Sequence, residues 1–217
     1  MKSVSAAVQS IISQDEIALE SMRAGILNMS AYAEQIQQTV DEITWKSVKK
    51  GTIVVALSRI AQELSTQSAS LRPFVQIDDI SIRSPLCDVS FDKSKPNQEA
   101  TKALLQSRIY RQPNSFFTVT EGVSEITIIA PDRYYDTILE MYSTVPKATY
   151  RGLTGISIRF SESYLDIPNV IYVLVGQLAL KQINVLEIVS TYTELAVVVE
   201  EKDSELALMA LRQYMSK

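Results

Sequence analysis

The chain has 217 residues, and its apolar content of 46% is typical of a globular protein with one large domain or two small ones. The net charge of −4 gives no general affinity for polyanions, and the single cysteine, Cys87, excludes an intrachain disulfide. Without a run of about 18 apolar residues or a secretory signal, the sequence predicts a cytoplasmic protein with no membrane association.

Residues 1–70 are predicted to form an all-helical domain. Apolar residues recur at helical spacing, and the helices are expected at 4–13, 17–25, 31–43 and 52–64. Gly25 suits the position just after a helix, where a left-handed backbone is common. Either Asn28 or Ser30 is a suitable N-cap for the third helix.

The break at 44–51 between the last two helices resembles the turn of a helix-turn-helix or winged-helix DNA-binding domain, in which the second helix lies in the major groove. The candidates for phosphate or base contacts with DNA are Lys46, Ser47, Lys49, Lys50 and Thr52. The alternative is a helical packing or dimerisation domain with Lys49 and Lys50 simply solvated. The apolar character of the last helix and the near balance of acidic and basic residues in this region favour that alternative.

Residues 65–72 are polar and serine-rich and precede Pro73, which predicts the domain boundary there. The following stretch, 73–151, alternates between strand and helix patterns. Strands are expected at 75–83, 86–91, 115–120, 125–130 and 147–151, and helices at 98–111 and 131–142. From 86–91 onward, the order strand, helix, strand, strand, helix, strand is that of a ferredoxin-like unit.

The same order recurs in residues 152–217, which indicates an internal repeat. Residues 123–130 align with 192–199, and a helix that ends near a tyrosine follows each of them, at Tyr142 and Tyr214. The second copy has strands at 155–160, 185–190 and 195–200, but its last helix, 204–215, leaves no room for a fourth strand. We therefore hypothesise that the two units interleave and that strand 75–83 completes the second one. The predicted fold is α+β, an all-helical domain followed by two tandem ferredoxin-like βαββαβ units.

The loop at 165–170 connects the first strand and first helix of the second unit. Pro168 suits the first position of that helix, and Asp166 is a suitable cap. The N–H groups that open a helix have no partner within it, so they can bind a carboxylate.

These residues resemble ACT domains, which are small ligand-sensing ferredoxin-like modules. Asp166-Ile-Pro-Asn-Val170 is similar to the family's Asp-x-Pro-Gly-Val loop, with Asn169 in place of glycine. Ile183-Asn-Val185 is similar to its Ile-Asn-Ile strand start. Residues 190–199 resemble a hairpin in the tandem regulatory half of aspartokinases, where the two units also interleave.

The resemblance implies an amino acid ligand bound between paired modules, in a homodimer or a higher homo-oligomer. The residues that it places at the ligand are Asp166, Asn169, Val170 and Ile171 from the loop, Asn184 and Val185 from the strand, and Thr193 and Glu194 from the hairpin. The alternative is that Asn184 only stabilises a turn and that Asp166 is only a helix cap.

The sequence gives no sign of an enzyme. It has no histidine, which excludes Ser-His-Asp and Cys-His nucleophile systems and zinc sites that need imidazole. It also has no phosphate-binding or dinucleotide-binding glycine motif. We therefore predict no catalytic residues, no metal and no cofactor. The predicted function is a non-catalytic regulatory protein whose ACT-like units sense a small ligand and control the helical domain, with DNA as one candidate partner of that domain. The alternative is a structural or protein-interaction and oligomerisation module that binds no ligand.

Overall fold

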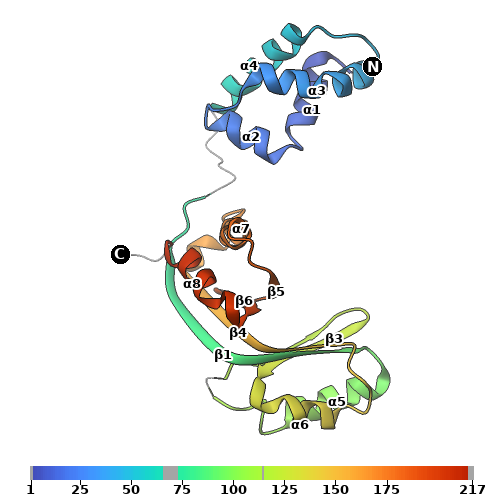
Figure 1. Cartoon of the computed structure of the whole chain (residues 1–217), viewed down its shortest axis with the longest axis vertical. Coiled ribbons are helices and arrows are strands. Elements are labelled where there is room, and N and C mark those ends of the chain that lie inside the picture. The colour runs from blue at the N-terminus through green and yellow to red at the C-terminus, as the bar shows by residue number, and fades with distance from the viewer. Residues whose placement is uncertain (1, 66–72, 114, 215–217) are drawn as a thin grey trace. The chain divides into compact units, whose positions relative to one another are not determined.

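A computed structural model describes residues 2–65, 73–113 and 115–214, and the chain divides into two compact units, residues 1–71 and 72–217 (Figure 1). Most of the predicted linker, 66–72, lies outside the described residues, as does Met215 at the predicted end of the last helix. Each unit has a hydrophobic core of its own, and each is considered by itself below.

The N-terminal unit consists of four helices, as predicted. They are α1 (Val4–Ile12), α2 (Glu16–Arg23), α3 (Met29–Thr44) and α4 (Lys50–Ser65). Ser3, Asp15 and Asn28 cap the first three helices, each accepting a hydrogen bond from a backbone N–H three residues later. Gly25 has φ +72° directly after α2, and Ile26 N donates to Ser21 O at 2.9 Å, so the predicted glycine stop is confirmed.

Helix α4 differs from its prediction in where it begins and in how it is buried. It begins at Lys50, two residues before the predicted start at Thr52. Ile53, Leu57 and Ile60 are buried in the core of the unit, whereas Val55 on the other side is 53% exposed. The helix is therefore amphipathic in the structure, although its sequence looked apolar nearly all round.

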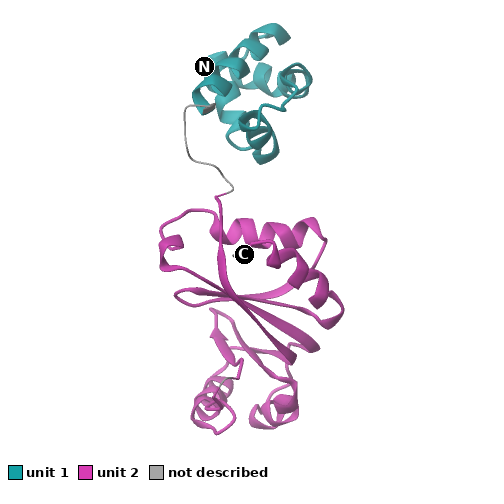
Figure 2. Cartoon of the chain, turned by 90° about the vertical axis from the view of Figure 1, so that its left-hand side faces the viewer, with its two compact units in different colours: residues 1–71 teal, residues 72–217 magenta. Residues whose placement is uncertain are grey.

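The second unit contains one six-stranded antiparallel sheet in the order β2-β3-β1-β4-β6-β5 (Figure 2). The strands are β1 (Ile77–Asp92), β2 (Thr118–Glu121), β3 (Glu125–Pro131), β4 (Ala148–Phe160), β5 (Val185–Ser190) and β6 (Glu194–Glu200). The helices are α5 (Lys95–Gln106), α6 (Tyr135–Met141), α7 (Val170–Leu180) and α8 (Ser204–Arg212), with 3-10 turns η1 (Asp132–Tyr134), η2 (Glu162–Tyr164) and η3 (Glu201–Asp203). The α+β fold class is thereby confirmed.

Two pairs of predicted strands are single long strands in the structure. Strands 75–83 and 86–91 form the continuous β1, and strands 147–151 and 155–160 form the continuous β4. The β1–β4 register shifts between Arg83 and Leu86 and again between Leu86 and Asp88, so the pairing continues past the cis Ser84–Pro85 bond instead of ending there. Helix α5 also spans 95–106 rather than 98–111, because Ser94 caps it early and the chain turns at Ser107.

The long strands join the two halves of the sheet. Residues 77–83 of β1 pair with 155–160 of β4, which in turn pairs with β6, and this is the pairing that interleaving requires. Residues 86–92 of β1 pair with β3 along one edge, while 86–90 also pair with 148–153 of β4 along the other. Helices α5 and α6 cover the first half of the sheet, and α7 and α8 cover the second (Figures 1 and 2).

Candidate functional site

The loop before α7 has a different geometry from the predicted one. Helix α7 begins at Val170, and the preceding Asn169 has φ +71° and makes no side-chain capping bond. Pro168 therefore lies in a turn ahead of the helix and not at its first position, and Asp166 is not its cap. The physical reason is the left-handed Asn169, which breaks the helical path between Pro168 and Val170; asparagine is one of the few residues that tolerates this conformation.

A depression of about 210 Å³ lies at this loop, and we call it the α7 depression. It is lined by Phe160, Tyr164, Leu165, Ile167, Asn169, Val170, Ile171 and Tyr172. Three of the predicted ligand residues, Asn169, Val170 and Ile171, are among them. The other five, Asp166, Asn184, Val185, Thr193 and Glu194, are not part of its lining.

Those five residues differ in their exposure and in their contacts. Asp166, Asn184 and Glu194 are exposed to solvent. Val185 packs against the core of the second half. Thr193 lies beside the strand that ends at the depression, since its carbonyl oxygen accepts a hydrogen bond from Phe160 N at 3.1 Å.

The α7 depression combines an apolar wall with the opening turn of a helix. Ile171, Leu165 and Ile167 are 49%, 42% and 37% exposed, which is unusual for large apolar side chains that line a hollow. The lining contains no charged side chain. The first N–H groups of α7 have no partner within the helix, so they can bind a carboxylate while the apolar wall contacts a hydrocarbon group.

The predicted nucleic-acid residues come together at the turn between α3 and α4. Lys46, Ser47, Lys49 and Thr52 are exposed, whereas Lys50 is partly buried. Lys50 Nζ lies 2.7 Å from Glu34 Oε2 and lowers the pKa of that carboxyl, so its charge is matched within the unit.

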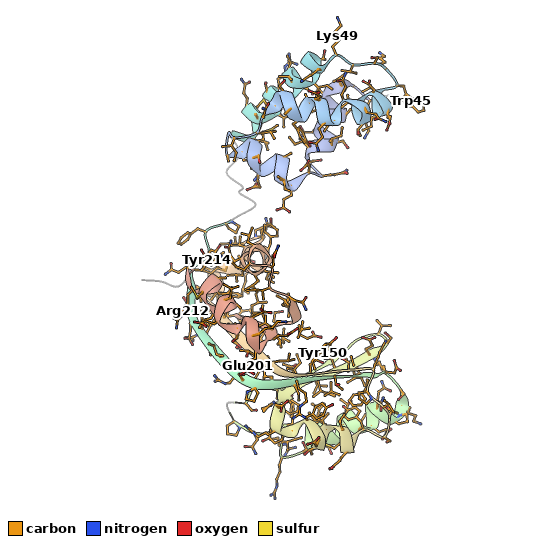
Figure 3. The ribbon with its side chains drawn as sticks, viewed as in Figure 1. Trp45, Lys49, Tyr150, Glu201, Arg212 and Tyr214 are labelled. Atoms are coloured by element: carbon orange, nitrogen blue, oxygen red, sulfur yellow. The ribbon has the colours of Figure 1, made fainter. Side chains whose placement is uncertain are left out.

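The turn is held rigidly and presents a tryptophan. Val48 N donates to Asp41 Oδ1 at 2.7 Å, and Gln37 Nε2 donates to Val48 O at 2.9 Å. Trp45 has φ +55° and is 84% exposed, and it points away from the helices together with Lys49 (Figure 3). Sequence reasoning missed Trp45, because only the backbone shows that it follows the end of α3 in a left-handed conformation.

The only thiol of the chain, that of Cys87, is buried and stays protonated at neutral pH. Cys87 is fully buried, and burial, together with the negative charge of Asp132, raises the pKa of its thiol to about 11. Within residues 2–65, 73–113 and 115–214 the structure shows no cluster of three or more Cys, Asp or Glu side chains that could hold a metal. Over the same residues, no helix has the length and apolar character needed to cross a bilayer.

The sheet unit thus has the architecture of two tandem ACT-like units. Solved structures show the same fold: the aspartokinase alpha and beta subunits are 17% identical, with a TM-score of 0.51 over 64% of this chain and 97% of that one. The ligand-free regulatory subunit of aspartate kinase from Thermus thermophilus is 13% identical, with a TM-score of 0.52 over 65% of this chain and 99% of that one.

The same fold also forms one part of a longer protein, an aspartate kinase. The aspartate kinase of Clostridium acetobutylicum is 14% identical, with a TM-score of 0.54 over 72% of this chain and 40% of the enzyme. No family model and no curated protein matches the sequence. At these identities the likeness establishes the fold, and the function has to be argued from the site.

Proposed function

We propose that this chain is a non-catalytic regulatory protein whose tandem ACT-like units bind an amino acid at the α7 depression and control the N-terminal helical unit. The observation that carries the proposal is the depression itself, where apolar side chains meet the opening turn of α7. The fold shared with regulatory subunits of aspartate kinase supports it.

The lining indicates which amino acids fit. With no charged side chain in the wall, an acidic or basic ligand side chain would lose its hydration without gaining a counter-ion. An aliphatic or aromatic ligand side chain would instead cover Ile171 and Leu165. We therefore propose an apolar amino acid, whose carboxylate accepts hydrogen bonds from the start of α7.

A thermal-shift screen of the full chain against the common amino acids tests this proposal. An apolar amino acid present at about a hundredfold its Kd is expected to stabilise the protein by about 2.7 kcal/mol. The substitution Ile171→Ser should abolish the shift. Ile188→Ser is the matched control, because Ile188 on β5 is similarly exposed, at 46%, and lies outside the lining. A shift that survives Ile171→Ser would place the ligand elsewhere.

For the output of the helical unit we propose nucleic-acid binding through the turn between α3 and α4. Lys46 and Lys49 offer exposed cationic groups on a turn that hydrogen bonds from Asp41 and Gln37 hold in place. The affinity for genomic DNA fragments, measured by gel shift at low salt, should fall when both lysines are changed to alanine, since each phosphate contact contributes to it. Arg59→Ala, an exposed cationic residue within α4 and outside the turn, is the control. DNA affinity that is unchanged by the double substitution would count against nucleic-acid binding through this turn.

A second candidate is an interaction and oligomerisation module without a ligand. It is favoured by the edge strand β5 and its hairpin, where Ile188 and Tyr192 are 46% and 67% exposed and leave an apolar border for another chain. Sedimentation analysis separates the two candidates: self-association that no amino acid changes, together with an empty thermal-shift screen, supports the module. Association that shifts with an amino acid supports the regulatory protein, because a ligand moves such an equilibrium only by binding its two states differently.

A further inference from the structure

A second depression, also of about 210 Å³, lies in the first half of the sheet unit. Three segments that are distant in sequence form it: the irregular part of β1, the residues ahead of β2, and the junction of β3 with η1. Its lining is Arg83, Ser84, Pro85, Leu86, Ser115, Phe116, Pro131, Asp132 and Arg133. It shares no residue with the α7 depression, and we call it the arginine depression.

The lining carries an excess of positive charge. Arg83 and Arg133 are exposed, and neither forms an ion pair with any residue that the structure describes. The one acidic lining residue, Asp132, is already occupied by Arg151, whose Nε and Nη2 donate to its two oxygens at 2.9 and 2.6 Å. That pairing lowers the pKa of Asp132, so the carboxylate stays ionised and matched by Arg151.

Both guanidinium groups keep hydrogen-bond donors to spare. Arg83 Nη1 donates to Ile82 O at 2.9 Å, and the Arg133 guanidinium carbon lies 4.7 Å from the centre of the Tyr134 ring. A guanidinium has five N–H donors in a planar fork, so each of these contacts leaves several that can bind an oxyanion.

Ser115 adds a neutral donor to the wall. Its Oγ is buried and has no hydrogen-bond partner among the described residues. A buried hydroxyl in that state lowers stability, and an acceptor supplied by a ligand would remove the penalty. The neighbouring Ser84 Oγ is already used, since it accepts from Thr154 Oγ1 at 3.2 Å and donates to Leu153 O at 3.5 Å.

The apolar side of the depression depends on a close approach of two strands. Gly155 on β4 lies opposite Arg83, and a Cβ atom there would be 2.9 Å from Leu86 Cδ1 and 3.9 Å from Phe116 Cδ1. Glycine thus lets Leu86 and Phe116 pack on β4 instead of filling the space between the arginines.

We propose that the arginine depression binds a small oxyanion, the phosphate or carboxylate group of a small molecule, between Arg83 and Arg133, with Ser115 Oγ as a third donor. Its volume suits a single anionic group with a short substituent and is below that of sites for drug-sized ligands. This site is independent of the amino acid proposed for the α7 depression.

The first test is calorimetric titration of the full chain with inorganic phosphate and, separately, with malonate, at fixed ionic strength. Arg83→Gln and Arg133→Gln should each weaken binding by about tenfold or more, because each removes a charged hydrogen bond. The matched control is Arg111→Gln, an exposed arginine outside the lining, and it should bind as the parent does. Preference for phosphate or malonate identifies the source of the oxyanion. Failure of both probes to bind, or equal affinity in all the variants, would overturn the proposal.

Ser115→Ala gives a second, independent readout. In the ligand-free protein it should leave the urea midpoint unchanged or raise it, because it removes a buried hydroxyl that has no described partner. In the titration it should weaken oxyanion binding severalfold. A purely structural serine would give the reverse result, a lower midpoint with unchanged affinity, and that outcome would rule out Ser115 as a donor to the anion.

Discussion

The two halves of the sheet unit differ at the connection between the first strand and the first helix of each half. In the first half, Asn97 in the first turn of α5 ties the end of β1 in place: it is fully buried, its Nδ2 donates to Asp92 O at 2.8 Å, and its Oδ1 accepts from Thr144 Oγ1 at 2.9 Å. In the second half, the loop before α7 has no side-chain cap and opens onto a depression. The same loop of the repeated fold is therefore tied by buried side chains in one half and uncapped in the other.

The connection tied by Asn97 is backed by a second layer of polar and aromatic contacts. The hydroxyl oxygens of Thr101 and Tyr142 lie 2.7 Å apart, and both residues are buried. The Tyr142 ring stacks on Phe91 with centroids 4.1 Å apart. Buried polar groups that satisfy one another leave no donor for a ligand at this loop.

The largest expected effect breaks the layer behind that connection. Tyr142→Ala removes a ring that is only 3% exposed and should lower the free energy of unfolding by about 3–5 kcal/mol, through lost packing and the cavity left behind. Urea unfolding of the full chain measures the change. Tyr150→Ala is the control, because Tyr150 is 49% exposed and its loss should cost about 1 kcal/mol or less. Equal losses at the two positions would mean that the layer behind the loop is not tightly packed.

The next largest expected effect concerns Asp88, which lies where the two halves of the sheet meet. Asp88 on β1 is 3% exposed, and burial together with the negative charge of Glu187 on β5 raises the pKa of its carboxyl to about 6, from an ordinary value of 3.8. The folded state thus binds this proton more tightly than the unfolded state does. Its contribution to stability is complete below pH ~4 and is lost as the pH rises from ~4 to ~6.

Asp88→Asn should remove that loss. The variant is expected to be more stable than the parent at pH 7 by up to about 3 kcal/mol, which corresponds to a pKa difference of about two units, and nearly equal at pH 4. Urea midpoints measured for both proteins from pH 4 to pH 7.5 check this, and the difference between them cancels the carboxyls that do not interact with Asp88. If the urea midpoints of parent and variant change with pH in parallel, the pKa of Asp88 is not raised.

Local signals in the sequence were sufficient for the repeat and for two helix ends in the N-terminal unit, the start of α3 and the stop after α2. The two hairpins were recognised from 123–130 and 192–199, and in the structure each is followed by a 3-10 turn and then a helix. Asn28 and Gly25 act within a few residues of their own position, so their roles could be predicted without knowledge of the fold.

Features that depend on pairing between distant segments could not be predicted in this way. Pro85 suggested a break because proline is rare within central strands, yet β1 continues through it by shifting its register against β4. The burial of Asp88 follows from packing between the halves and leaves no mark on its neighbours in sequence. The arginine depression joins residues from three separate segments, whereas three residues of the α7 depression were found because they follow one another in a single loop.

The smallest expected effects compare the two helix starts through one asparagine at each, Asn97 in the first turn of α5 and Asn169 directly before α7. Asn97→Ala should lower the free energy of unfolding by about 1–3 kcal/mol, because the fully buried Asn97 side chain loses its hydrogen bonds with Asp92 O and Thr144 Oγ1. Asn169→Gly should change it by less than ~1 kcal/mol, and toward higher stability, because glycine adopts φ +71° without steric cost. Urea unfolding of both variants gives the comparison. A loss at Asn169 as large as that at Asn97 would show that the loop before α7 is held by its own side chains, and the α7 depression would then be a structural hollow instead of a ligand site.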